Sequence, residues 1–79
     1  MSMPEDKPLR YRELLYRLKK FGVQEKIGKG SRRILYHPNI NGNPAFVAIH
    51  PHSEHYEFSR KVVKITRRRF NIPIEEFYK

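Results

Sequence analysis

The sequence predicts a small α+β domain with two layers, in which two helices cover one face of a three-stranded antiparallel sheet. Two segments have apolar residues at helical spacing, three short runs between them have the composition of strands, and turn residues separate these runs. A chain of 79 residues is long enough for one such domain. We expect residues 1–8 to form a flexible N-terminal tail and residues 9–79 to form the folded domain.

The first helix is predicted over residues 9–20. Gly22 follows it at the position where a helix commonly ends in a left-handed conformation. The apolar stripe has the spacing i, i+3, i+4, i+7 and consists of Tyr11, Leu14, Leu15 and Leu18.

Three strands are predicted over residues 23–29, 32–37 and 45–50. Gly28 and Gly30 make the first turn, and Asn41-Gly42 is a strong signal for a hairpin between the second and third strands. We expect Ile34, together with Phe46 or Val47, to face the helices.

A second helix is predicted from Ser59 to about Phe70, with Asn71 as its left-handed cap and a final short turn over residues 72–79. Phe58, Val62, Thr66 and Phe70 are expected to share its apolar side. The opposite side is expected to carry the cations Arg60, Lys61, Lys64, Arg67 and Arg68.

The charge balance points to an anionic partner. Seventeen lysines and arginines against eight acidic residues give a formal net charge of +9. RNA is the first candidate, because a basic surface that neutralises phosphates releases counterions. No apolar run approaches the ~20 residues that span a bilayer, and no signal-peptide pattern precedes the domain. We expect a cytoplasmic protein without a membrane partner.

Several segments, in order, resemble the HicA family of small toxins. They are "LLYRLKKFGV", "GKGSRRILYHP", "VAIHPHSE" and the basic second helix followed by "FNIPIEEF". The resemblance extends over about residues 9–78. It implies a dsRBD-like fold, similar to that of double-stranded-RNA-binding domains, with the order α-β-β-β-α. It also implies action on messenger RNA and neutralisation by a HicB-like antitoxin protein.

The chain departs from the family at one position that matters for catalysis. The resemblance implies a catalytic histidine after Gly30-Ser31, and this sequence has Arg32 there, followed by Arg33. Histidine exchanges protons near neutral pH, whereas arginine stays protonated and can only bind phosphate or stabilise charge. We therefore predict an RNA-binding protein with reduced or absent mRNA-cleaving activity. The predicted RNA-binding residues are Lys29, Ser31, Arg32, Arg33, Arg60, Lys61, Lys64, Arg67 and Arg68.

Two other functions stay open. One is an active mRNA endoribonuclease that uses His37 or His50, and the other is a basic interaction module that docks an acidic antitoxin-like partner. His50, His52 and His55 have a spacing that zinc can use. Because the chain has no cysteine and no clear fourth ligand, we predict no metal and no cofactor.

Overall fold

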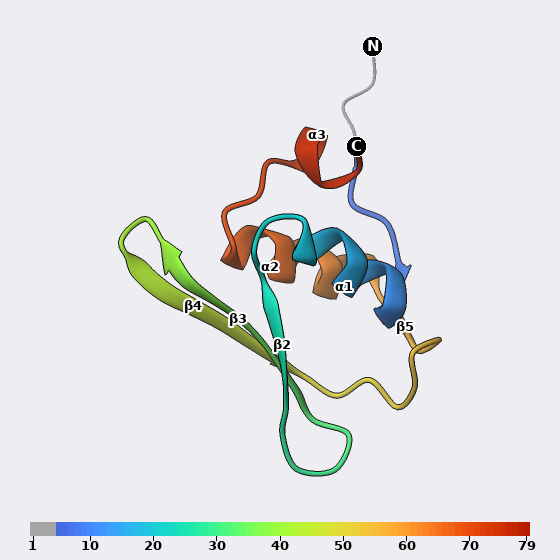
Figure 1. Ribbon diagram of the computed structural model, residues 1–79. Helices are drawn as coiled ribbons and strands as arrows, with labels where there is room; N and C mark the ends of the chain where they lie inside the picture. The colour runs from blue at the N-terminus through green and yellow to red at the C-terminus, as the bar shows by residue number, and fades with distance from the viewer. Residues whose placement is uncertain (1–4) are drawn as a thin grey trace.

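The computed structural model describes residues 5–79 and confirms the predicted order of helices and strands (Figure 1). Two very short strands and a short last helix accompany the predicted elements. The full order is β1 (Leu9–Arg10), α1 (Tyr11–Lys19), β2 (Gln24–Ile27), β3 (Arg33–Ile40), β4 (Asn43–Ile49), β5 (Glu57–Phe58), α2 (Arg60–Arg69) and α3 (Ile74–Phe77). Among residues 5–79, no helix is both long enough and apolar enough to cross a membrane.

Helix α1 ends as the sequence predicts. Gly22 has a φ of +86°, and its N–H donates to the carbonyl oxygen of Lys19 at 3.1 Å. A side chain at this position would be strained by the backbone conformation, and its Cβ would lie 2.9 Å from Nε2 of His37. Gly22 therefore lets the chain turn sharply into β2 while His37 packs against it.

Strands β2, β3 and β4 form an antiparallel sheet in that order. Asn41 and Gly42, with φ values of 54° and 89°, form the predicted hairpin turn. The two strands of this hairpin are longer than predicted, because β3 continues to Ile40 and β4 starts at Asn43. Their register is irregular between His37 and Ile40, a stretch that contains Pro38, which has no N–H to donate.

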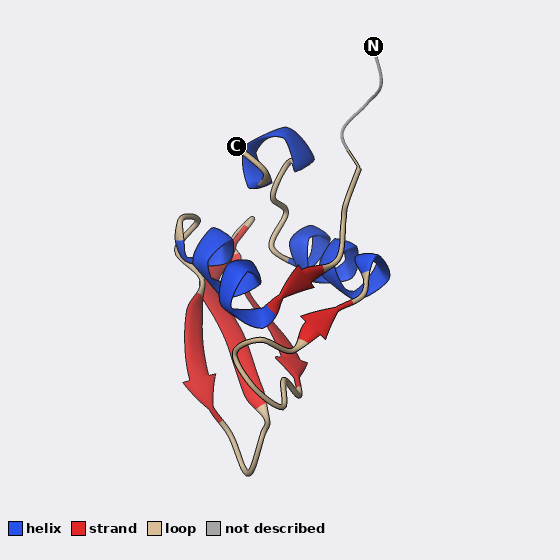
Figure 2. Ribbon diagram, turned by 90° about the vertical axis from the view of Figure 1, so that its right-hand side faces the viewer, coloured by secondary structure: helices blue, strands red, loops and turns tan. Residues whose placement is uncertain are grey.

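The apolar core lies between the sheet and the helices, which cover one of its faces (Figure 2). Leu14 and Leu18 of α1, Leu35 of β3 and Val63 of α2 are fully buried in it. The expectation that Ile34 faces the helices is wrong: its neighbour Leu35 does so, opposite Val47. Both faces of β3 carry apolar residues, so its alternation alone does not decide which face is buried.

No helix formed by residues 5–79 covers the other face of the sheet (Figure 2). Phe46 lies there with 57% of its surface exposed, opposite Tyr36. Of the two β4 residues considered for the core, Val47 is therefore the one that packs against it.

Helix α2 begins at the predicted cap, where the Ser59 hydroxyl accepts a hydrogen bond from the Val62 N–H at 3.3 Å. Three of the four residues predicted for its apolar side, Phe58, Thr66 and Phe70, are buried, and Val62 is half-buried. The buried side also includes Val63 and Arg67. The expected position of Arg67 on the exposed basic side is wrong.

Arg67 is buried because it pairs with Asp6. Its Nε and Nη2 atoms donate to the two carboxylate oxygens of Asp6, both at 2.9 Å, and its Nη1 donates to the carbonyl oxygen of Ile72 at 2.8 Å. The Tyr78 hydroxyl donates to Asp6 at 3.0 Å. We call Asp6, Arg67 and Tyr78 the terminal clasp. The hydrogen bonds from Arg67 lower the pKa of Asp6, against the opposing effect of burial.

The terminal clasp changes the expected extent of the N-terminal tail. Asp6 is only 7% exposed although it falls within residues 1–8, and the N–H of Lys7 donates to the Tyr78 hydroxyl at 3.2 Å. The part of that segment from residue 5 onward thus runs beside α3 (Figure 1). Residues 1–4 lie outside the described residues.

Candidate nucleic-acid interface

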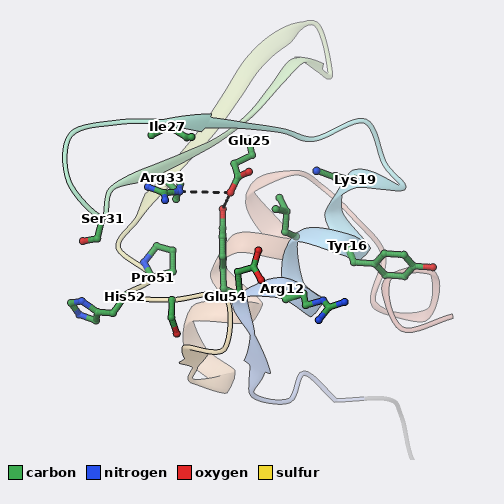
Figure 3. A pocket seen from close by; sticks show the side chains of 13 residues that line it. Arg12, Tyr16, Lys19, Glu25, Ile27, Ser31, Arg33, Pro51, His52 and Glu54 are labelled. Atoms are coloured by element: carbon green, nitrogen blue, oxygen red, sulfur yellow. Dashed lines mark hydrogen bonds and ion pairs between the residues drawn. The ribbon is translucent and has the colours of Figure 1, made fainter.

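A groove of about 570 Å³ lies between α1, the turn that joins β2 to β3, and the loop of residues 50–54 (Figure 3). Its charged lining consists of three cations, Arg12, Lys19 and Arg33, and two carboxylates, Glu25 and Glu54. Tyr11, Tyr16, Ser31 and His52 also line it. This groove is the candidate site.

Three side chains are linked inside the groove, and we call Tyr11, Glu25 and Arg33 the groove triad. The Tyr11 hydroxyl donates to a Glu25 carboxylate oxygen, and Nε of Arg33 lies 3.8 Å from the same oxygen. Burial, followed by the hydrogen bond to Glu25, raises the pKa of Tyr11 well above its ordinary value. Tyr11 therefore stays protonated at neutral pH and acts as a donor to Glu25.

The turn between β2 and β3 directs its two arginines to opposite sides of the sheet. Ile27 pairs with Arg33, and both line the groove. The adjacent Arg32 stacks its aliphatic stem over Gly28, where an added Cβ would lie 3.2 Å from its Cγ. Because side chains alternate along a strand, Arg32 extends on the face opposite the groove. Backbone bonds between Gly28 and Arg32 and between Arg32 and Lys29 close the turn.

The predicted RNA-binding residues fall into two separate groups. In the first, Ser31 and Arg33 line the groove, and Lys29 and Arg32 are exposed on its turn. In the second, Arg60, Lys61 and Lys64 surround a different hollow on α2, next to Asp6. Arg68 is exposed beyond it, and the buried Arg67 belongs to the terminal clasp. The structure therefore does not join the turn and α2 into one site.

The four histidines are also dispersed. His37 accepts the Asn39 N–H on Nδ1 at 3.0 Å and packs against Gly22, far along β3 from the turn. His50 is exposed directly after the Arg33–Ile49 pair, where β4 ends. His52 lines the groove, and His55 lines a neighbouring hollow. Within residues 5–79, no three potential metal ligands among histidine, cysteine, aspartate and glutamate come together.

Three groove residues, Arg12, Tyr16 and Lys19, were not among the predicted RNA-binding residues. Their spacing of i, i+4, i+7 places them on one face of the helix, and that face lines the groove. A basic stripe interrupted by one aromatic residue was the signal for them.

In a comparison with known protein families, the family model of the HicA toxin of bacterial toxin–antitoxin systems matches residues 11–64 of this chain. This range is more than half of the chain and includes every element that builds the groove. The chain belongs to the HicA toxin family. The resemblance inferred from the sequence is thereby confirmed, as is the α-β-β-β-α fold. No curated protein matches the chain.

Membership of the HicA family places this protein in a toxin–antitoxin lineage. The matched range ends at Lys64, before Arg67 and α3. The groove thus belongs to the part of the chain that matches the family, whereas all three residues of the terminal clasp lie outside it.

Proposed function

We propose that this HicA-family protein binds duplex or structured RNA, with messenger RNA as the target that the family implies, and cleaves it slowly or not at all. The observation that carries the proposal is the set of cations around the groove and its turn. Arg12 and Lys19 form no ion pair within residues 5–79, and Lys29 and Arg32 are exposed at the turn between β2 and β3, with Arg32 on the face opposite the groove. Unpaired cations spread over the groove and its turn favour a polyanion.

The exposed cations of α2 are proposed as a second phosphate-binding surface. Arg60, Lys61, Lys64 and Arg68 are exposed, with no acidic residue between them along the helix. Like charges at i, i+4 destabilise a helix by a few tenths of a kcal/mol, and a bound phosphate would relieve this repulsion. Arg67 is left out of this surface because its guanidinium is occupied by Asp6.

Slow cleavage follows from Arg32 at the position of the family histidine. RNA cleavage through the 2′-hydroxyl needs one group to accept a proton and another to deliver one. Arg32 keeps its proton at neutral pH, so it can hold a phosphate and stabilise developing negative charge but cannot exchange protons.

Binding is tested by titrating labelled duplex RNA at several salt concentrations. We expect affinity to fall steeply as salt rises. The double substitution Arg12→Glu/Lys19→Glu should weaken binding and flatten this dependence, and Arg60→Glu/Lys61→Glu reverses the same number of charges on α2 for comparison. Absence of RNA binding at low salt would contradict the proposal.

Cleavage is tested with Arg32→His, which restores an imidazole at the matching position. A positioned acid or base contributes about 10²–10⁴-fold, so we expect cleavage to rise, with an optimum near neutral pH. Arg33→His is the matched control, because it places the same ring on the groove side of the sheet. Efficient cleavage by the unmodified protein would contradict the proposed loss of activity.

An active nuclease that uses His50 is the second candidate function, and the position of this residue favours it over His37. His50 follows the Arg33–Ile49 pair, so it lies at the same end of the sheet as Arg32. His37 packs instead against Gly22 and caps its own turn. Cleavage by the unmodified protein that disappears in His50→Ala, and survives in His52→Ala, would establish this function.

A HicB-like antitoxin is the proposed protein partner. The toxin–antitoxin lineage and the net charge of +9 support an acidic surface on that partner. Competition between such a partner and RNA for the groove is the expected result, measured as loss of bound RNA when the partner is added. A partner that binds while RNA is retained would contradict a shared site.

A further inference from the structure

The exposed face of α1 combines two cations with one aromatic ring. Arg12, Tyr16 and Lys19 all line the groove, and their spacing puts Tyr16 between the two charges. Tyr16 is 63% exposed. Its hydroxyl makes no hydrogen bond with any residue from 5 to 79. Neither core packing nor a hydrogen bond within residues 5–79 therefore accounts for the position of this ring.

The Tyr16 ring differs from other exposed aromatic rings in what surrounds it. It lies where the groove meets a second hollow, which Arg10, Arg12 and His55 also line. The ammonium group of Lys20 lies 4.6 Å from the ring centroid, so a cation already contacts its π-system. Phe46 is similarly exposed, at 57%, but lines neither hollow.

The groove is long enough to separate two kinds of contact. Figure 3 shows Ser31, Arg33 and His52 at one end and Arg12, Tyr16 and Lys19 at the other, with the Glu25 and Glu54 carboxylates between them. A carboxylate in the middle repels a phosphate, whereas the cations at both ends attract one. A base placed over Tyr16 would leave its flanking phosphates beside Arg12 and Lys19.

We infer that this end of the groove holds an unpaired nucleotide of the RNA, with its base stacked on Tyr16 and its phosphates bound by Arg12 and Lys19. The inference rests on the proposed RNA binding and specifies which part of a structured RNA enters the groove. Bases in a duplex already stack on their neighbours, so only an unpaired base can present a face to an aromatic ring. The stacking is independent of base identity, because every base has a π-face.

The first experiment compares a single-stranded RNA oligonucleotide with a blunt duplex of the same length at low salt. Tyr16→Ala should weaken binding of the single strand by about 5- to 150-fold, the range for losing one stacked base, and leave duplex binding within about twofold. Tyr16→Phe keeps the ring and should retain single-strand affinity. Phe46→Ala removes an equally exposed aromatic ring from the other face of the sheet and should change neither affinity.

The second experiment uses fluorescence and does not depend on the stability of the alanine variant. The chain contains no tryptophan, so Tyr16→Trp introduces a single reporter at the proposed stacking position. Its emission should be quenched when the single-stranded oligonucleotide is added, whereas the emission of Phe46→Trp should not change.

The possible outcomes separate this inference from the proposed function. Equal losses of single-strand and duplex affinity in Tyr16→Ala, no loss of single-strand affinity, or equal quenching in the two tryptophan variants would overturn the inference alone. Failure of the unmodified protein to bind RNA of either kind would overturn the proposed function.

Discussion

The terminal clasp and the groove triad contain the same three chemical groups in different arrangements. Each has a carboxylate, an arginine and a tyrosine hydroxyl. In the terminal clasp, Arg67 donates two hydrogen bonds of 2.9 Å to Asp6, and both side chains are nearly inaccessible. In the groove triad, Arg33 is 3.8 Å from Glu25, and each side chain is 27% exposed.

This difference shows how the same groups acquire different uses. A bidentate, buried ion pair satisfies both charges and leaves nothing for a ligand. A long, partly solvated contact is weak, so Arg33 can exchange Glu25 for a phosphate at little cost. The number of arginines alone therefore does not show how much of the positive charge of this protein is free to bind phosphate.

The largest expected effect is on the stability of the terminal clasp. Asp6→Ala leaves the Arg67 guanidinium buried without its partner, and breaking a buried pair in this way costs about 3–5 kcal/mol. Glu25→Ala, the equivalent change in the groove triad, should cost less, about 1–3 kcal/mol, because it leaves the buried Tyr11 hydroxyl without its acceptor while the contact with Arg33 adds little. Urea unfolding of the two variants measures both values, and equal losses would remove the distinction between the two sites.

A second prediction concerns acid. The pKa of Asp6 is below its ordinary value of 3.8 because Arg67 donates hydrogen bonds to it. The folded protein therefore holds this proton less tightly than the unfolded chain. The stabilisation is fully present above pH 3.8 and is lost as the pH falls through the lower value of the folded protein.

Asp6→Asn tests the acid prediction, since an amide does not titrate in this range. The difference in unfolding free energy between the unmodified protein and Asp6→Asn should be constant near neutral pH and shrink below pH 3.8. A difference that stays constant down to the most acidic pH would show that Asp6 does not stabilise the fold through its charge.

The smallest expected effect is on RNA affinity. Glu25→Gln removes one negative charge from the groove beside Arg33, so RNA binding should strengthen by a few-fold at low salt and the gain should disappear at high salt. Glu76→Gln makes the same charge change on the exposed surface of α3 and should have less effect. Titration of the same labelled RNA with both variants measures the comparison, and an equal gain would mean that only net charge matters.

Local patterns predicted the fold well. The stripe of α1, the Asn41-Gly42 turn and the Ser59 cap depend on neighbouring residues, and each is found where the sequence indicated it. Local patterns could not predict which face of β3 is buried, because Ile34 and Leu35 lie on opposite faces and both are apolar enough for the core. The groove required the tertiary structure too, because α1, β2, β3 and the loop of residues 50–54 meet there.

Arg67 shows why part of the site was wrongly predicted. The sequence predicts a second helix with five cations on the side opposite its apolar residues. No neighbouring residue in the sequence distinguishes Arg67 from Arg68 on that side. Its partner Asp6 lies 61 positions earlier, in a segment whose polar composition suggested a loose tail. A contact of that separation leaves no periodic signal.

The terminal clasp also affects when the domain can be completed during synthesis. Asp6 leaves the ribosome early, whereas Arg67 and Tyr78 emerge 61 and 72 positions later. The hairpin of β3 and β4 can close as soon as its own residues are free, but Asp6 must wait for almost the whole chain. A nascent chain of this sequence therefore carries an unpaired Asp6 until Arg67, 61 positions later, has left the ribosome.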